Sequence, residues 1–211
     1  MKSITLAAGA PGIKLTWIIS SLLFVWLLLV TALAGSGVLA GTEGSQPLVM
    51  PAAIFLPVLA FVLAYRYSPG LRARVADLDT GLLVILHTWR MLGAGFLLLY
   101  AFDVLPGLFA WLAGGGDMLV ATGALILGVR LLQGRQVTRA YLLRWNAFGL
   151  LDFLVAVGVG TALRSTNFGG PVSTDAMASL PLSLIPTFIV PVYLILHAMI
   201  ILQYRGVNHG T

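Results

Sequence analysis

The sequence predicts an all-α protein: a single integral membrane domain over residues 1–211, folded as a bundle of six transmembrane helices. Composition is the first observation behind this prediction. Hydrophobic residues make up 59% of the chain and charged residues 9%, and the mean hydropathy is +1.00. A soluble domain has about a quarter of its residues charged, so this chain carries too few charges to cover a surface that faces water. The second observation is a series of apolar stretches of about 20 residues, the length that crosses a bilayer.

Six apolar segments have roughly this length and define the predicted spans. The fourth is the shortest, because the stretch LPGLFAWLAGGG before it (residues 105–116) is apolar but too short to cross a membrane. We expect that stretch to dip into the outer interface, and Asp117, which follows three glycines, to cap the fourth helix. The predicted spans are residues 15–39, 48–67, 80–104, 117–132, 143–163 and 182–203.

The Lys and Arg residues predict how the bundle is oriented. Of the twelve in the chain, ten fall on the side of the two termini, Arg164 falls on the opposite side and Arg90 lies within a span. Short loops rich in Lys and Arg stay in the cytoplasm, so both termini are expected to be cytoplasmic (N-in/C-in). Trp and Tyr residues near the ends of spans are expected to form interfacial belts. These residues are Tyr65, Tyr67, Trp111, Trp145 and Tyr204.

Polar residues within the apolar spans define the candidate site. His87 and Arg90 lie in the third predicted span, Asp152 in the fifth, and Tyr193 and His197 in the sixth. At 1.5 Å per residue, all five fall about 9–15 Å from the cytoplasmic boundary, within the same half of the bundle. Residues three or four apart share a helix face, as His87 and Arg90 do in the third span. A charge at the centre of a span costs about 2.5–3.5 kcal/mol, so it is expected to serve a function.

These residue types fit a substrate or proton site. Asp152 and the two histidines can bind and release protons, and Arg90 can hold an anionic group or pair with Asp152. Pro186 and Pro191 each remove a hydrogen bond from the outer half of the sixth span, and a broken helix beside a polar cluster is typical of transport pathways. The alternative is purely structural: an Arg90–Asp152 ion pair that fixes the helix register, with both histidines neutral.

The two histidines also allow a cofactor site. His87 and His197 could be the axial ligands of one b-type haem, because they lie at a similar depth on different helices. The histidines with Asp152 could instead hold a metal ion, or Arg90 and Tyr193 could contact a quinone. The chain contains no cysteine, which excludes thiolate metal sites, cysteine nucleophiles and disulfides.

Motifs of several other functional classes are missing from the sequence. No span contains a lysine for a retinal Schiff base, no phosphate-loop lysine follows glycines 114–116, and no G-x-S-x-G motif is present. No basic patch with interleaved aromatics indicates nucleic-acid binding. The leading hypothesis is therefore a non-enzymatic transporter or permease-like unit that acts as a homo-oligomer in the lipid bilayer. The alternatives are a haem- or quinone-linked redox subunit and an accessory subunit of a larger membrane complex.

Several short motifs follow one another between Trp89 and His197. They are Trp89-Arg90, Leu105-Pro106, Ala113-Gly114, Gly116-Asp117, Arg144-Trp145-Asn146, Gly149-Leu150-Leu151-Asp152, and PLSLIPTF at residues 181–188. Through these motifs, about half of the chain resembles an uncharacterised family of bacterial polytopic inner-membrane proteins. The resemblance implies a bacterial inner-membrane location, and it brings no activity, cofactor or site residue with it. The first two predicted spans lie outside this resemblance.

Overall fold

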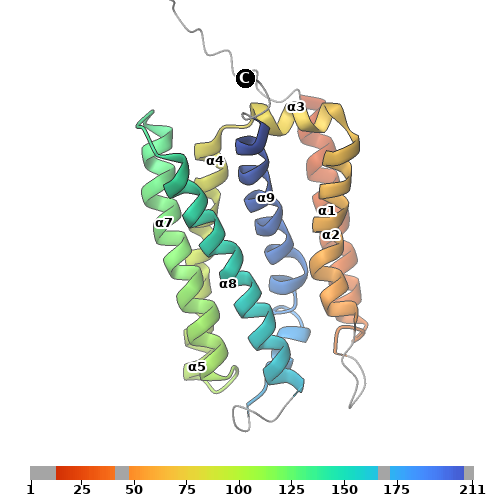
Figure 1. The fold of residues 1–211 in the computed structure, drawn as a ribbon. Helices are drawn as coiled ribbons and strands as arrows, with labels where there is room; N and C mark the ends of the chain where they lie inside the picture. The colour runs from red at the N-terminus through yellow and green to blue at the C-terminus, as the bar shows by residue number, and fades with distance from the viewer. Residues whose placement is uncertain (1–12, 41–47, 166–171, 207–211) are drawn as a thin grey trace, which may run out of the picture.

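The computed structural model of the chain describes residues 13–40, 48–165 and 172–206, and every regular element in these ranges is helical. Their order along the chain is shown by colour in Figure 1. The elements are α1 (Ile13–Gly35), α2 (Val49–Tyr67), α3 (Pro69–Asp77), α4 (Thr80–Ile85), η1 (Leu86–Gly93), α5 (Ala94–Ala101), α6 (Gly107–Phe109), η2 (Ala110–Gly114), α7 (Gly115–Leu132), α8 (Arg139–Ser165), η3 (Asp175–Ala178), η4 (Ile185–Ile189) and α9 (Val190–Gly206).

Six helices in this part of the chain are long and apolar enough to cross a membrane, which confirms the predicted number. Three of them are composite: α4, η1 and α5 form the third, α6, η2 and α7 the fourth, and η4 and α9 the sixth. The fourth differs most from its prediction, because it begins at Gly107 instead of Asp117. The apolar stretch before Asp117 is therefore the first part of this helix and not an interfacial dip.

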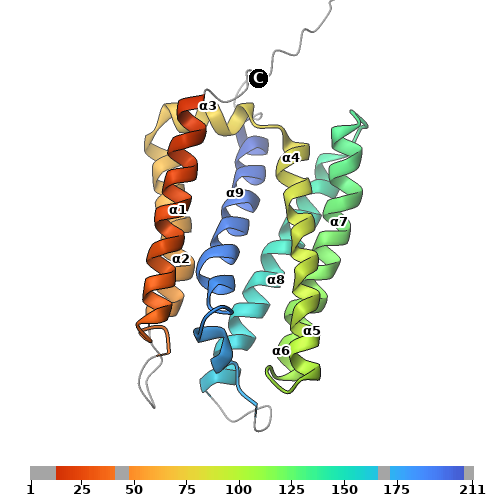
Figure 2. The ribbon, with the colours of Figure 1, turned by 180° about the vertical axis from the view of Figure 1, so that it is seen from behind.

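The helices stand side by side around α9, as two opposite views show (Figures 1 and 2). On one side of α9 lie α4, α5, α7 and α8, and on the other lie α1 and α2. Buried residues make up 28–39% of the four C-terminal spans but only 11% of the first and 6% of the second. The α1–α2 pair is therefore peripheral, and the four remaining spans form the packed body of the bundle.

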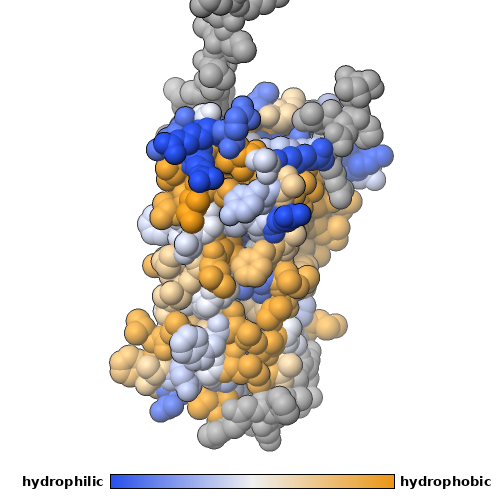
Figure 3. All heavy atoms as spheres, turned by 60° about the vertical axis from the view of Figure 1, so that its left-hand side comes forward, coloured by the Kyte–Doolittle hydropathy of each residue, from blue (hydrophilic) through white to orange (hydrophobic). Residues whose placement is uncertain are grey.

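One end of the bundle is strongly basic and is crossed by the short helix α3 (Figure 1). Ser68 caps α3 by accepting a hydrogen bond from the amide of Leu71, and Gln203 of α9 donates to the carbonyls of Val75 and Leu78. Figure 3 shows hydrophilic residues gathered at this end, beyond an apolar middle. The arginines in the helix ends and loops there are Arg66, Arg72, Arg74, Arg130, Arg135, Arg139 and Arg144.

The third long helix has an unusual repeat that decides where its polar residues point. Its central segment, η1, is a 3₁₀-helix of eight residues, in which side chains three positions apart eclipse one another. His87, Arg90 and Gly93 are the buried residues of η1, and Val84 and Phe96 continue the same three-residue spacing in α4 and α5. The helix therefore presents one straight buried stripe, with Arg90 at its centre.

One wide π-helical turn interrupts the fourth long helix, and a second forms the first turn of the sixth. The first turn is η2, and the second is η4, which contains Pro186. Pro186 lies in the first turn of this helix, where an amide hydrogen would have no helical acceptor, so it marks the start of the helix and not the break predicted within its outer half. Turns of the π-helical kind occur often at functional sites.

Two apolar clusters form the interior of the bundle, one towards each end. Val84, Val120 and Trp145 belong to the cluster nearer the basic end, and Phe96 and Phe109 belong to the other. Arg90 lies between Val84 and Phe96 along its own helix. The polar residues of the candidate site thus occupy the layer between two hydrophobic cores.

Candidate functional site

Arg90 lies at the centre of the site and is only 3% exposed. Its Nε donates to Asp117 Oδ1 at 2.7 Å, and its Nη2 forms a short ion pair with Asp152 Oδ2. Its Nη1 lies 3.2 Å from His197 Nε2 and 3.5 Å from the carbonyl oxygen of Gly149. All three nitrogens of the guanidinium are engaged, so Arg90 pairs with carboxylates of the chain itself and does not offer a site for an anionic ligand.

The guanidinium also rests on an aromatic ring. Its central carbon lies 3.8 Å from the centre of the Phe153 ring and 6.0 Å from that of Tyr193. A cation over the face of an aromatic ring is attracted by the ring's quadrupole, and the attraction is stronger where water is excluded. Phe153 therefore fixes the plane in which Arg90 can meet the two carboxylates.

Asp117 is the main residue of the site that the sequence did not place correctly. It does not cap a helix: ten residues of the fourth long helix precede it, and its carboxylate pairs with Arg90. Glycines make room for both carboxylates. A Cβ on Gly93 would lie 2.5 Å from Asp117 Oδ2, and one on Gly116 would collide with Asp152 Oδ1. Gly116 therefore allows close packing inside the bundle, and the glycines before Asp117 do not mark a helix start.

His197 is held in one neutral form by its two partners. An arginine can only donate, so His197 Nε2 accepts from Arg90 and its Nδ1 carries the hydrogen. That Nδ1 donates to Asn146 Oδ1 at 2.8 Å, and Asn146 Nδ2 donates back to the carbonyl of His197. Asn146 is 1% exposed and was not predicted as a site residue. Its position three residues before Gly149 on α8 is the helical spacing that could have indicated it.

His87 packs against His197 and is fully buried. Its Nδ1 donates to the carbonyl of Leu83 at 2.9 Å, and its Nε2 has no hydrogen-bond partner among the described residues. The Trp145 ring meets His87 edge-on at 5.2 Å, and its Nε1 donates to the carbonyl of Val120 at 3.0 Å. The prediction that Trp145 belongs to an interfacial belt is therefore wrong, because the ring is 8% exposed and fills the space beside the histidines.

The structure brings together the five predicted residues and shifts the depth of two of them, Arg90 and Asp152. Arg90, Asp152 and His197 are in direct contact, His87 packs on His197, and Tyr193 lies near Arg90 and His87. Ten residues of its long helix precede Arg90 and eleven follow it, and Asp152 has thirteen before it and twelve after it. Both therefore lie near the middle of their helices and not in the half nearer the basic end. The histidines lie closer to that end.

The geometry does not fit a haem between the two histidines. A macrocycle must lie between its axial ligands, but the ring centres of His87 and His197 are only 4.2 Å apart. Both Nδ1 atoms and His197 Nε2 are already hydrogen-bonded. The described residues also contain no group of three or more His, Asp or Glu side chains arranged to hold a metal ion. Arg90 uses four of its five N–H donors on residues of the chain, and the quinone contact stays a prediction.

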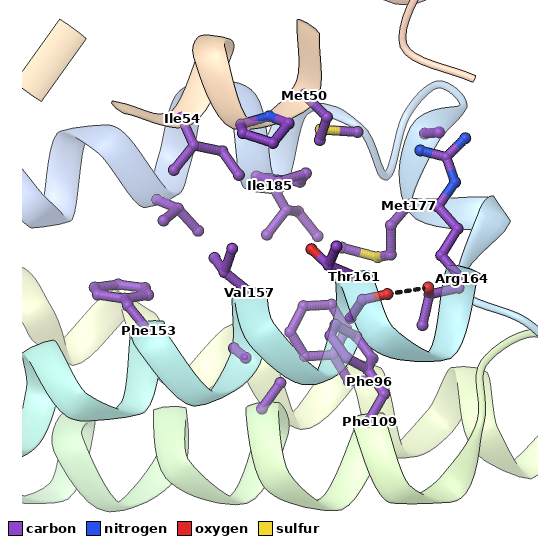
Figure 4. A pocket seen from close by; sticks show the side chains of 18 of the residues that line it. Met50, Ile54, Phe96, Phe109, Phe153, Val157, Thr161, Arg164, Met177 and Ile185 are labelled. Carbon is purple, nitrogen blue, oxygen red and sulfur yellow. Dashed lines mark hydrogen bonds between the residues drawn. The ribbon is translucent and has the colours of Figure 1, made fainter. Parts of the chain in front are cut away.

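A cavity of about 110 Å³ lies beside the Arg90 cluster. It extends along α8 from Phe153 at one end to Arg164 at the other, with α2 on the opposite wall (Figure 4). Both π-helical turns border it, through Ala113 of η2 and Pro186 of η4. The remaining lining is almost entirely apolar and comes from Met50, Pro51, Ile54, Phe96, Phe109, Ala156, Val157, Gly160, Thr161, Thr174, Met177, Ala178, Ile185 and Val190.

The charges at the inner end of the cavity are negative. Asp117 and Asp152 line it, whereas Arg90 lies behind them and does not. Arg90 engages one oxygen of each carboxylate, and no hydrogen bond from the described residues reaches Asp117 Oδ2 or Asp152 Oδ1. One guanidinium facing two carboxylates leaves a deficit of one positive charge when both are ionised. A proton or a cation at this point would restore neutrality, which a low-dielectric interior strongly favours.

Arg164, the single arginine predicted on this side, lines the outer end of the cavity. Its Nε donates to Asp175 Oδ1 at 3.0 Å and its Nη1 to the carbonyl of Leu39 at 3.1 Å, which joins α8, η3 and the chain after α1. Thr174, 2% exposed, donates to the carbonyl of Gly160 at 2.6 Å and lines the same end. The described part of the long outer loop thus lines the cavity, and residues 166–171 of that loop lie outside the described residues.

Comparison with known proteins gives one match. The sequence model of a family described as a domain of unknown function (DUF8737) matches residues 47–205. This range includes every residue of the site and five of the six long helices, so it extends the similarity seen between Trp89 and His197 to the second span. No curated protein and no solved structure matches the chain.

Proposed function

The chain belongs to the DUF8737 family, whose function is unknown, and we propose that it is a small proton-coupled transporter that carries a hydrophobic molecule across a membrane. One observation carries this proposal: two carboxylates share one guanidinium at the inner end of an apolar cavity, near the middle of helices of membrane length. The cavity would hold the substrate, and the carboxylate pair would hold the coupled proton.

The charge balance supports the proton site. With Arg90 charged and His197 neutral, the Asp117–Asp152 pair needs one proton for the interior to be neutral. The other polar groups that face the pair are His197 and Tyr193 from α9, and neither adds a positive charge in the neutral histidine form described above. A transport cycle needs such an exchangeable proton beside its substrate, and acidic residues within spans serve this purpose in pumps and transporters.

The helix irregularities support movement at the same place. The π-helical turns η2 and η4 border the cavity, and the 3₁₀-helix η1 carries Arg90. Interrupted helices that meet at a binding site near the bilayer centre are typical of secondary transporters. A change in hydrogen-bonding pattern at these turns would move the cavity walls without unfolding the long helices.

We also propose the orientation and location of the chain. The basic end of the bundle, with α3, the start of α1 and the end of α9, would face the cytoplasm, and the cavity would widen in the outer half once the Arg164 contacts separate. The resemblance to bacterial inner-membrane proteins favours that membrane. The exposed apolar side chains of the long helices would be covered by lipid.

Infrared spectroscopy of the protein in nanodiscs tests the proton site without knowledge of the substrate. At neutral pH we expect the C=O stretching band of one protonated carboxylic acid, lost in Asp117→Asn or Asp152→Asn. The matched control is Asp103→Asn, because Asp103 is exposed and its positive φ of 55° is one that asparagine also tolerates. A wild-type spectrum without this band would contradict the proton site.

Proteoliposomes with a trapped pH indicator test the transport itself. Under an imposed pH gradient, hydrophobic molecules of positive, neutral and negative charge are added in turn. Wild-type protein is expected to move protons with at least one class, Asp103→Asn to do the same, and Asp152→Asn to move none. Equal proton movement by wild type and Asp152→Asn would overturn the proposal.

The peripheral α1–α2 pair favours a second candidate, in which the chain is a subunit of a larger membrane assembly. Few residues of these spans are buried, and α1 is held mainly through contacts such as Trp26 against Phe188 at 4.9 Å. A neighbouring subunit packed on α1 would explain this weak attachment. Native mass spectrometry from the membrane would show a stable complex in this case, and a monomer otherwise.

A further inference from the structure

The cavity beside Asp117 and Asp152 has features that define a class of ligand. We propose that it binds a small organic monocation: a primary ammonium group on a hydrocarbon body about the size of one benzene ring. The ammonium would lie against the two carboxylates, and the body would lie among the apolar side chains along α8. This inference rests on the proposed function and names the substrate class for the same site.

The charge of the ligand follows from which groups face the cavity. The two carboxylates line the inner end, and their second oxygens, which lie beside Gly93 and Gly116, receive no hydrogen bond from the described residues. An ammonium group supplies three donors and the missing positive charge, whereas a neutral hydroxyl supplies one donor and no charge. An anionic group would meet only acceptors there, because Arg90 lies behind the carboxylates and is engaged through all three nitrogens.

The groups at the outer end of the cavity do not change the preference for a cationic ligand. Arg164 lines that end, but its charge is paired with Asp175, and it also donates to the carbonyls of Leu39 and Ala40. Three turns of α8 separate Arg164 from Asp152. A second positive charge at the outer end would therefore meet Arg164, which favours a ligand with a single charge at one end of its body.

The size and shape of the ligand follow from the volume and the lining. A cavity of about 110 Å³ that is partly open to the surface is of the same order as an engineered, enclosed apolar cavity of about 150 Å³ that holds benzene. Phe96, Phe109 and Phe153 line it, and Val157 points into it from α8 (Figure 4). A single ring or a short alkyl chain fills this space, and an aromatic body would pack against these three rings.

A set of three ligands with one shared ring tests the proposal on the wild-type protein. Benzylamine is protonated at neutral pH, benzyl alcohol is its neutral counterpart and benzoate its anionic counterpart. Isothermal titration calorimetry of the protein in nanodiscs, with empty nanodiscs subtracted, gives each dissociation constant. We expect benzylamine to bind at least tenfold more tightly than the other two. Equal or tighter binding of benzyl alcohol or benzoate would overturn the cation site.

Variants locate the binding within the cavity. Val157→Phe fills the space and leaves both carboxylates intact, so benzylamine should bind at least tenfold more weakly to it. Asp152→Asn should weaken binding by a similar factor, and the exposed Asp103→Asn should bind like wild type. Unchanged binding by Val157→Phe, with its thermal unfolding unaltered, would show that the amine binds elsewhere and would overturn the proposal.

Proton release separates this inference from the transport proposal. If the ammonium takes the place of the proton shared by Asp117 and Asp152, titrations in buffers of different ionisation enthalpy should show about one proton released per benzylamine bound. Specific benzylamine binding without coupled proton movement in proteoliposomes would overturn transport and leave the cation site intact. Proton movement driven by a neutral compound, without benzylamine binding, would overturn the cation site and leave the transport proposal intact.

Discussion

At the scale of single residues, the interior of this bundle depends on one guanidinium. Arg90 meets Asp117, Asp152 and His197 at once, and it is the only residue among the described contacts that offsets the two carboxylates. A buried ion pair adds little to stability compared with well-packed apolar residues, but removal of one partner leaves an uncompensated charge. The cluster is therefore sensitive to the loss of Arg90 and more tolerant of a change that removes all its charges together.

Replacement of Arg90 by methionine tests this dependence. Arg90→Met should lower the free energy of unfolding by about 3–5 kcal/mol, because two carboxylates remain buried without their partner. The triple variant that adds Asp117→Asn and Asp152→Asn should recover much of this loss. Thermal unfolding in detergent compares the two, and equal stability of the single and triple variants would show that charge is not the cause.

Neighbouring glycines of α7 offer a matched test of packing at the same site. A Cβ on Gly116 collides with the Asp152 carboxylate, whereas one on Gly115 has nothing within 4 Å. Gly116→Ala should therefore destabilise the protein by about 1–3 kcal/mol through overpacking. Gly115→Ala should be neutral or stabilising by about 0.5–1 kcal/mol, because alanine favours the helix. Thermal unfolding measures the stability of the two variants, and similar destabilisation by both would contradict the packing argument.

At the scale of helices and loops, the sequence predicted the number of long helices and failed at one boundary. The glycines at 114–116 look like a helix break in isolation, because glycine is a poor helix former. The role of Gly114 and Gly116 is set by what packs on them, and a local pattern does not contain that information. The convergence of His87, Arg90, Asp152 and His197 was predictable, because charged groups in apolar helices have few stable places other than next to one another.

Other features of the elements had no signal in the sequence. The 3₁₀ bonding of η1 and the burial of Trp145 both depend on tertiary packing, and an aromatic residue near a span end fits an interfacial belt equally well. The pairing of Asp117 with Arg90 joins residues 27 positions apart and follows from the earlier helix start. Each of these misses concerns which neighbour a residue meets, and not which kind of element it belongs to.

The loop that lines the outer end of the cavity should respond to acid. The hydrogen bond from Ser173, and to a smaller extent the bond and charge of Arg164, hold the pKa of Asp175 below its ordinary value of 3.8, although burial acts in the opposite direction. A carboxyl with a lowered pKa in the folded state stabilises that state at pH values above its unfolded pKa. This contribution is lost as the pH falls through the lower, folded pKa.

Hydrogen exchange of residues 172–178 at a series of pH values measures this response. After correction for the intrinsic exchange rate, wild-type protection should be constant above about pH 4 and fall at lower pH. Asp175→Asn cannot ionise, so its protection should be lower near neutral pH and should lack the acid-dependent step. An acid-dependent step of equal size in Asp175→Asn would assign it to another group.

At the scale of the whole molecule, charge is sorted between the two ends of the bundle. The basic end holds arginines from two stretches that are distant in sequence, residues 66–74 and 130–144, and the opposite end pairs Arg164 with Asp175. This distribution is the basis for placing the basic end in the cytoplasm. The two ends of the molecule therefore differ in charge, and the cavity lies nearer the less charged end.

Labelling of introduced cysteines tests this orientation, and the chain has no native cysteine to interfere. Arg135→Cys lies in the loop between α7 and α8, at the basic end. Phe102→Cys lies after α5, at the other end, and the native Phe102 is 77% exposed. A membrane-impermeant maleimide added to intact cells should label Phe102→Cys and not Arg135→Cys. The opposite pattern would invert the proposed topology.

The 3₁₀ segment of the third long helix connects bilayer thickness to the position of Arg90. A 3₁₀-helix rises about 2.0 Å per residue and an α-helix about 1.5 Å, so the eight residues of η1 span about 4 Å more than they would as α-helix. In the α form, Gly93 would turn about 120° away from His87 and the straight buried stripe would be lost. We therefore expect thick bilayers to favour the arrangement described here and thin ones to release Arg90. Thermal unfolding and benzylamine affinity in nanodiscs of short- and long-chain lipids measure this dependence, and equal values in both would show that Arg90 does not respond to membrane thickness.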